Sequence, residues 1–220
     1  MKSFIISIVL LTSMFGTTGE KPPKEVALKM VNTDQLTQEV YTLIAALRAN
    51  PSSFADKMLL VIEQNTYKSD NPKVTNRLCF PEGVCIKMTN SFLLDLQETI
   101  AVLKQTPKLG PLEKDAALIR AAQCLGKDRF TRSHYGTDGS TPGERAREAG
   151  YLKTVNECMM DIRASAMGIV TTFLIDHKVK NRGHRKNLLH PETVKIGVSC
   201  VYHPFDVTDE FIRCVIVGGY

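Results

Sequence analysis

The sequence predicts an α+β fold in one globular domain. Its 220 residues are 43% hydrophobic and 23% charged, which suits a single domain of ~100–200 residues. Apolar residues with helical spacing dominate the earlier part of the chain, and the two clearest β-rich runs, 195–202 and 211–217, come last. This order favours an α+β sandwich over a repeated βαβ arrangement.

Residues 1–19 are expected to be a secretory signal peptide. Lys2 precedes an apolar run of about eleven residues that fades by Met14, and small residues follow up to Gly19. Such a run is shorter than the ~20 residues needed to span a bilayer. We therefore expect a secreted, extracellular protein without a transmembrane anchor, in which residues 20–33 form a short arm before a domain over 34–220.

Two helices are predicted at the start of the domain, on either side of Pro51. Asp34 is the expected N-cap of the first helix, and Pro51 is expected to end it because proline has no backbone N–H to donate. Its apolar face consists of Leu36, Val40, Leu43, Ile44 and Leu47. Ser52 or Ser53 is the expected cap of the second helix, whose face consists of Phe54, Met58, Val61 and Ile62.

Three more helices follow from the same spacing of apolar residues. The first lies in a turn-rich, less regular segment and has the apolar face Leu93, Leu96, Ile100 and Leu103. The second has the face Leu118, Ala121, Ala122 and Leu125, and the third has the face Ala166, Ile169, Val170 and Phe173. The segment between these last two helices is expected to be polar loop.

The β-rich runs at the end are predicted to form a hairpin with a long loop over 203–210. Pairing residues whose numbers sum to 414 sets Cys200 directly opposite Cys214, within reach of a disulfide. Export favours disulfides among the six cysteines, for which fifteen pairings exist. Cys79 and Cys85 bracket a turn-like segment and form the second expected bridge. Cys124 and Cys158 remain as a third pair or as free thiols.

The sequence lacks the motifs that usually identify several classes of function. The chain has no GxGxxG, GxxxxGK[ST], GxSxG or HExxH motif, which argues against dinucleotide, P-loop, α/β-hydrolase and zincin chemistry. Its net charge is +5 without a block of five consecutive like charges, so no nucleic-acid partner is expected. The basic cluster 178–186 could meet anionic headgroups, although a solvated loop is the simpler interpretation.

Two histidines and two acids remain as candidates for chemistry: His134, Glu157, Asp176 and His184. Taken singly, each has a structural explanation, because a loop histidine is commonly solvated or hydrogen-bonded. Neutral imidazoles with carboxylates also suit a divalent ion such as zinc, with each acid orienting a ring through its second nitrogen. Their spacing matches no local zinc motif.

The succession of residues around these four resembles the CAP superfamily, which comprises cysteine-rich secretory, antigen 5 and pathogenesis-related proteins, and is closest to its short microbial branch. The residues that carry the resemblance are Ser133-His134, Asp138-Gly139, Glu144-Arg145-Ala146, Ala149-Gly150-Tyr151, Asn156-Glu157, Phe173 to Asp176, Gly183-His184-Arg185-Lys186-Asn187-Leu188-Leu189 and Ile196-Gly197-Val198. The resemblance covers 108–220 well and 34–64 weakly, so the segment at about 65–107 looks like an insertion.

The resemblance implies a three-layer α-β-α sandwich with a cleft lined by two histidines and two acids. By position these would be His134, Glu157, Asp176 and His184, as ligands of zinc or another divalent cation. Two departures stand out. Cys158 replaces the Asn that usually follows the motif's Glu, and Asp176 stands where the longer Glu is commoner, so we expect altered hydrogen bonds around Glu157 and a carboxylate set further back.

Three functions remain open from the sequence. The favoured one is a secreted, non-enzymatic module that binds a lipid or sterol, a divalent cation, or both, at the His/acid cleft, with an extracellular protein or anionic membrane surface as a further partner. The alternative is a metal-assisted hydrolase or protease using the same cleft. The third is a structural domain in which the four residues form an internal polar network.

Overall fold

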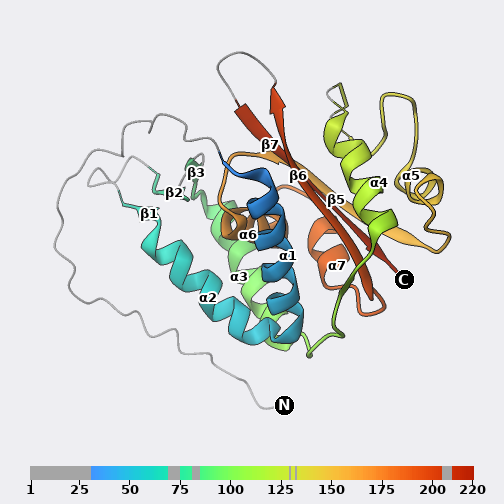
Figure 1. Ribbon diagram of the computed structural model, residues 1–220. Helices are drawn as coiled ribbons and strands as arrows, with labels where there is room; N and C mark the ends of the chain where they lie inside the picture. Colours follow the sequence, from blue (N-terminus) through green and yellow to red (C-terminus); the bar gives the residue numbers. More distant parts are fainter. Residues whose placement is uncertain (1–30, 69–74, 81–84, 129, 132, 205–209) are drawn as a thin grey trace.

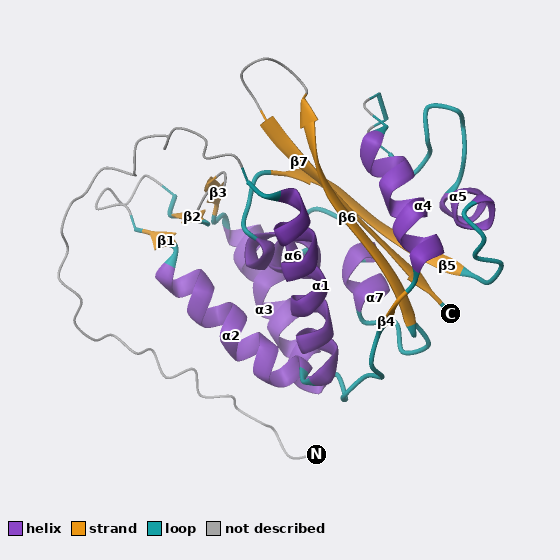
Figure 2. Ribbon diagram, viewed as in Figure 1, coloured by secondary structure: helices purple, strands orange, loops and turns teal. Residues whose placement is uncertain are grey.

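The computed structural model describes residues 31–68, 75–80, 85–128, 130–131, 133–204 and 210–220. Its centre is a four-stranded sheet with helices on both faces, which confirms the predicted α+β class and the α-β-α layers (Figure 1). Figure 2 shows the helices α1, α2, α3, α6 and α7 on one side of the sheet and α4 and α5 on the other. The predicted signal peptide lies outside the described residues.

The first two helices, α1 (Thr33–Ala49) and α2 (Pro51–Gln64), are confirmed, but their predicted caps are wrong. The side chain of Asn32, not Asp34, caps α1 by accepting from the backbone N–H of Gln35 at 3.0 Å. Asn50, not a serine, caps α2. Pro51 is the first residue of α2, where its missing N–H has no helical partner to lose.

The segment that sequence reasoning described least well contains three short strands and a helix. The strands β1 (Thr66–Tyr67), β2 (Arg77–Cys79) and β3 (Cys85–Lys87) form a small antiparallel sheet, in which Cys79 pairs with Cys85 in the predicted disulfide. The predicted helix is α3 (Asn90–Gln105), which packs against α2 and α6. Phe92 is buried and Leu93 is not, so the apolar face begins one residue earlier than expected.

The main sheet has the order β4-β6-β7-β5. Its strands are β4 (Glu113–Lys114), β5 (Val155–Ile162), β6 (Lys195–Pro204) and β7 (Glu210–Gly219). The predicted hairpin and its register are confirmed, because β6 and β7 pair antiparallel with Cys200 opposite Cys214 in a disulfide. The strand β5 pairs with β7 and is an edge of the described sheet.

The segment expected to be polar loop contains regular structure, which corrects the prediction. Between α4 (Ala116–Lys127) and α6 (Ala166–Ile175) lie α5 (Pro142–Glu148) and the strand β5. A capping box begins α5, in which Thr141 and Glu144 each accept from the other's backbone N–H. A further helix not expected from the sequence, α7 (Gly183–Leu188), follows α6.

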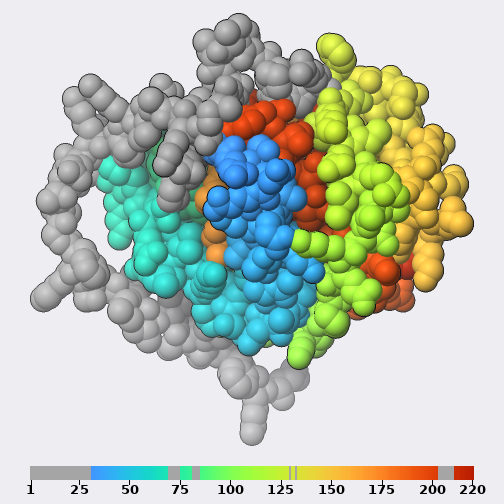
Figure 3. Space-filling model, in the orientation of Figure 1, coloured from blue at the N-terminus to red at the C-terminus, as the bar shows by residue number. Residues whose placement is uncertain are grey.

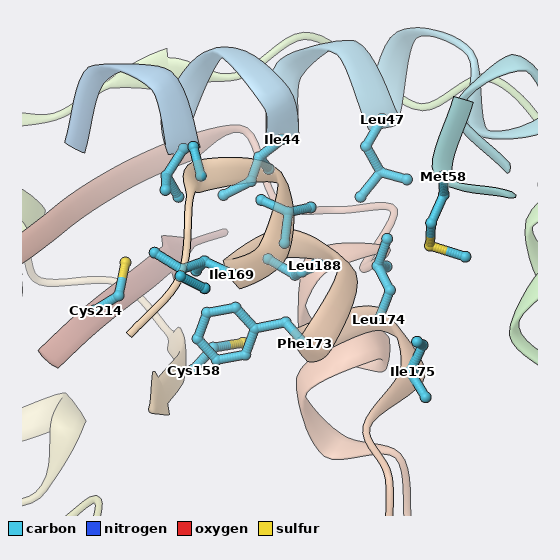
Figure 4. Close-up of a cluster of buried hydrophobic side chains, with 14 of the residues drawn as sticks. Ile44, Leu47, Met58, Cys158, Ile169, Phe173, Leu174, Ile175, Leu188 and Cys214 are labelled. Carbon is cyan, nitrogen blue, oxygen red and sulfur yellow. The ribbon is translucent and has the colours of Figure 1, made fainter. Parts of the chain in front are cut away.

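Two apolar clusters join these layers, one on each face of the sheet. The larger one contains α1, α6 and one face of the strands, and Figure 4 shows Phe173 of α6 lying against Cys158 of β5. The smaller one lies under α4 and includes Val215 and Val217. None of the helices that the structure describes is both long and apolar enough to cross a membrane.

The same two faces explain why the third pair of cysteines does not form a disulfide. Cys158 is buried in the larger cluster, whereas Cys124 belongs to α4 on the opposite face and is exposed. The sheet therefore lies between the two thiols. Both are free, as in the other alternative left open by the sequence.

Candidate functional site

The structure brings the four candidate residues together as two histidine–carboxylate pairs. In the first pair, Nδ1 of His134 lies 2.9 Å from Oε1 of Glu157. A carboxylate can only accept, so this ring nitrogen donates. The Glu157 side chain is 2% exposed and that of His134 is 42% exposed, so a buried acid orients a histidine that reaches solvent.

Arg145 of α5 holds this first pair in place. Its guanidinium is buried and donates to Oε2 of Glu157 at 2.8 Å, to the carbonyl of His134 at 3.0 Å and to the carbonyl of Ser140 at 2.6 Å. One cation thus neutralises the buried acid and holds the loop that carries His134 at His134 itself and at Ser140. Burial of Glu157 depends on this pairing, because an unpaired buried charge is strongly destabilising.

The second pair is Asp176 and His184. Asp176 is the left-handed C-cap of α6, with φ 51°. Its Oδ1 lies 2.8 Å from Nδ1 of His184, and its Oδ2 accepts from the backbone N–H of the same residue at 2.9 Å. One carboxylate therefore fixes both the ring and the backbone of His184 at the start of α7.

The two pairs lie on either side of the edge strand β5. Glu157 shares a face with Val155 and Met159, which pack under α4, while the next residue, Cys158, is buried against α6. The ring centroids of His134 and His184 are 6.0 Å apart and their planes are inclined by 45°. Asn187 of α7 also donates to the carbonyl of Glu157 at 2.9 Å. We call these four residues, His134, Glu157, Asp176 and His184, the tetrad.

The donors of the tetrad suit a divalent ion of the zinc type. Both Nδ1 atoms are committed to carboxylates, which leaves Nε2 of each ring as the donor available to a ligand, and a histidine oriented by a carboxylate is the usual arrangement around protein-bound zinc. Among the described residues, no group of three or more His, Cys, Asp or Glu is placed to hold one ion. The two histidines would therefore be the protein ligands, and the acids would orient them.

The oxygens of both acids are already occupied. Oε1 and Oε2 of Glu157 accept from His134 and Arg145, and both oxygens of Asp176 accept from His184. The hydroxyl of Ser133 lies 3.2 Å from the backbone N of Tyr135 in its own loop. Neither a free general base nor a nucleophile held by a base is present in this arrangement, and both are usual parts of a hydrolytic site.

Cys158, the residue after Glu157, is one of the departures noted in the sequence. The thiol of Cys158 lies 3.5 Å from the carbonyl of His184, which it can donate to. Burial raises the pKa of this thiol well above its ordinary value, so it stays protonated. Cys158 thus contributes a neutral contact to the second pair and leaves the carboxylate of Glu157 to Arg145 and His134.

Sequence reasoning missed the buried arginines around the site. Arg213 of β7 has no exposed surface, pairs with Asp161 at 2.7 Å and donates to the carbonyls of Asp128 and Thr131, at the start of the loop that carries His134. Arg48 of α1 donates to the carbonyl of Leu188 at the end of α7. Arginines are mostly exposed, so no signal in a single sequence distinguishes these from surface residues.

Two arginines of the basic cluster 178–186 are engaged within the protein. Arg185 is buried, and both Arg182 and Arg185 pair with acids of α3. This part of the cluster is therefore occupied by the protein itself rather than open to phosphates or headgroups.

Two cavities lie elsewhere on the molecule. One of about 150 Å³ lies between α1 and α4 over β6 and is lined by Thr37, Tyr41 and Val198 among others. Figure 3 shows this seam, where red strand atoms are visible between blue α1 and lime-green α4. The other, about 380 Å³, lies beside the loop after α4. Neither is lined by a residue of the tetrad.

Comparison with known proteins agrees with the class that this fold defines, an α-β-α sandwich with paired histidines and acids. Residues 112–216 match the family "CAP: Cysteine-rich secretory protein family". This part of the chain is a CAP domain. The comparison with curated proteins finds no match.

Three solved structures are similar to the chain. An outer surface protein from Borrelia burgdorferi is 23% identical with a TM-score of 0.42, and the match covers 62% of this chain and 97% of that one. An extracellular SCP-domain protein from Bacillus anthracis is 20% identical with a TM-score of 0.40, over 60% and 41% of the two chains. The CAP domain of enterococcal PrgA is 14% identical with a TM-score of 0.37, over 57% and 55%.

Proposed function

We propose that this chain is a secreted, non-enzymatic binding module whose tetrad holds a divalent cation through His134 and His184. The observation that carries the proposal is the pairing of each Nδ1 with a buried carboxylate, which leaves two oriented imidazoles 6.0 Å apart, centroid to centroid. Zinc is the ion whose preference for nitrogen ligands fits best. With only two protein ligands, we expect a modest affinity.

A cation is better supported than a lipid or sterol at the same site. Small-molecule sites usually enclose ~300–1,000 Å³ of mostly apolar space, and neither described cavity is lined by the tetrad. Pull-down of lipids with the purified protein tests this preference. Retention of a lipid by wild type, and its loss on His134→Ala/His184→Ala, would favour the apolar ligand instead.

Calorimetry with Zn²⁺ tests the cation directly. Metal-free wild type should release heat on binding, and His134→Ala/His184→Ala should lose that heat. His190→Gln is the matched control, because His190 stacks on Tyr220 and not on a residue of the tetrad, so its replacement should leave binding unchanged. Equal heats from wild type and the double variant would contradict the proposal and leave the tetrad as an internal polar network.

The hydrolase alternative requires a free general base. Neither Glu157 nor Asp176 supplies one, since the oxygens of both carboxylates are engaged in hydrogen bonds. A metal-bound water is the remaining route to hydrolysis. We expect no turnover on a panel of peptides and esters, with zinc or with chelator. Activity that chelator removes, that zinc restores and that Glu157→Gln abolishes would establish the enzyme.

A further inference from the structure

The helix α3 presents a row of polar side chains to the segment that carries Asp176 and His184. Asp95, Glu98 and Thr99 have the i, i+3, i+4 spacing that places them on one face of a helix. The helix lies before the residues matched by the CAP family, 112–216. Its contacts with the tetrad's second pair are therefore a feature of this chain beyond the matched domain.

The residue that follows each member of the second pair is held by α3. His177, which follows Asp176, lies with its Nδ1 2.6 Å from Oδ2 of Asp95. Arg185, which follows His184, donates to Oγ1 of Thr99 at 2.7 Å and pairs with Glu98. A helix distant in sequence thus holds both the residue after Asp176 and the residue after His184.

Arg182 connects α3 to Asp176 directly. Its guanidinium pairs with Asp95 and lies 2.9 Å from Oε2 of Glu98. A second nitrogen of the same group donates to the backbone carbonyl of Asp176 at 2.9 Å. The two carboxylates of α3 therefore hold Arg182, and Arg182 in turn holds Asp176, the C-cap of α6.

The backbone of this segment needs such support. Asp176, Lys178 and Arg182 all have positive φ, at 51°, 65° and 52°. Non-glycine residues in the left-handed region persist where surrounding contacts determine their conformation. The α3 contacts reach all three positions. They hold Arg182 directly, Asp176 through Arg182, and Lys178 through its neighbour His177.

We propose that α3 is a positioning element of the tetrad: Asp95 and Glu98, acting through Arg182, Arg185 and His177, fix the Asp176–His184 hydrogen bond. The consequence for zinc affinity rests on the proposed function, whereas the consequence for the His184 ring does not. Removing the two charges should release the segment 176–185, so that His184 loses its single orientation while His134, held by Arg145, keeps its own.

The test uses the full chain with Asp95→Asn/Glu98→Gln, a change that keeps side-chain shape. Two-dimensional ¹H–¹⁵N spectra of metal-free protein report which ring nitrogen of each histidine carries the proton. We expect wild-type His184 to be protonated at Nδ1, and the variant to give a mixture of tautomers at His184 with His134 unchanged. Zinc affinity should fall about 10-fold or more, as for loss of other groups that orient metal ligands.

Asp56→Asn is the matched control, because it removes a different ion pair of α3, the one between its Lys104 and Asp56 of α2. It should change neither readout. If the double variant does not fold, Glu98→Gln alone replaces it, at a carboxylate that is 45% exposed. This single variant should change the tautomer of His184 in the same direction. An unchanged His184 tautomer in every folded variant would overturn the proposal. Equal zinc affinity with a changed tautomer would overturn its consequence for metal binding. Because the tautomer is read in metal-free protein, failure of this proposal is distinguishable from a wild type that binds no zinc.

Discussion

Gly197 of β6 lies against the backbone of Leu118 in α4 so closely that a Cβ at position 197 would be 2.1 Å from the Leu118 carbonyl carbon. The approach of the helix to the sheet therefore depends on a missing side chain. This contact sets the depth at which α4 packs and, through it, where the loop carrying His134 begins.

Gly197→Ala should destabilise the fold, because the neighbour is backbone and cannot move aside. Overpacking in a core typically costs ~1–3 kcal/mol, and we expect at least that loss in the free energy of unfolding, measured with urea. Gly143→Ala is the matched control, since a Cβ there meets nothing within 4 Å. Equal stability of the two variants would contradict the packing described for α4.

The two free thiols should differ in reactivity. Cys124 is exposed, whereas Cys158 is buried and its pKa is raised by burial. Because the thiolate is the reactive form, a thiol reagent should modify one cysteine per native chain and both after denaturation without reductant. Absence of any reactive thiol in the denatured protein would indicate a third disulfide and contradict the arrangement of the two faces.

The Cys200–Cys214 bridge can be mapped in one digestion. Trypsin cuts after Lys195 and Arg213, which places the two cysteines in separate peptides, 196–213 and 214–220. Non-reduced, denatured protein should yield these two peptides linked, and reduction should separate them. Recovery of either peptide with a free thiol before reduction would count against the bridge.

The acids of α3 should make stability depend on pH. Burial by itself would raise the pKa of Asp95, but hydrogen bonds from His177 and Arg182 lower it by more, and the pKa of Glu98 is likewise below its ordinary value despite burial, through Arg182 and Arg185. A carboxyl group with a lowered folded-state pKa stabilises the fold above its unfolded-state pKa, and that contribution is lost as the pH falls through the folded value.

Wild type should therefore lose stability below about pH 4.5, near the ordinary pKa of a carboxyl group, and Asp95→Asn/Glu98→Gln should lose less over the same range. Urea unfolding at pH 6, 4 and 3 measures the difference. Parallel losses in the two proteins would show that these acids do not contribute to the pH dependence.

The sequence was sufficient wherever burial follows a simple period. The hairpin register and five helices follow from alternation or helical spacing of apolar residues, and the Cys200–Cys214 bridge follows from that register. The Cys79–Cys85 bridge was predicted from the turn-like segment between the two cysteines. The strand β5 was missed because its inward face includes Glu157, which is buried only through Arg145. The helix α5 has no apolar stripe, although Thr141 and Glu144 already carried the capping-box pattern that predicts a helix start.

The site residues were identified through their resemblance to a family, and their geometry could not be derived from spacing. Asp176 and His184 are close because the chain turns through left-handed residues between α6 and α7. The contributions of α3 and of the buried arginines depend on contacts between segments tens of residues apart. Such contacts leave no local pattern in one sequence.

The side chain of Asn187 limits how a second chain can pair with the edge strand β5. An edge strand presents unpaired backbone groups to which a further strand can add, and the side chain of Asn187 occupies the carbonyl of Glu157 on β5. A second chain that extended the sheet at this point would have to displace α7, and with it His184. Strand addition at this point of β5 and an intact tetrad therefore exclude each other, so the helix that carries the histidine also protects the protein from edge-to-edge aggregation there.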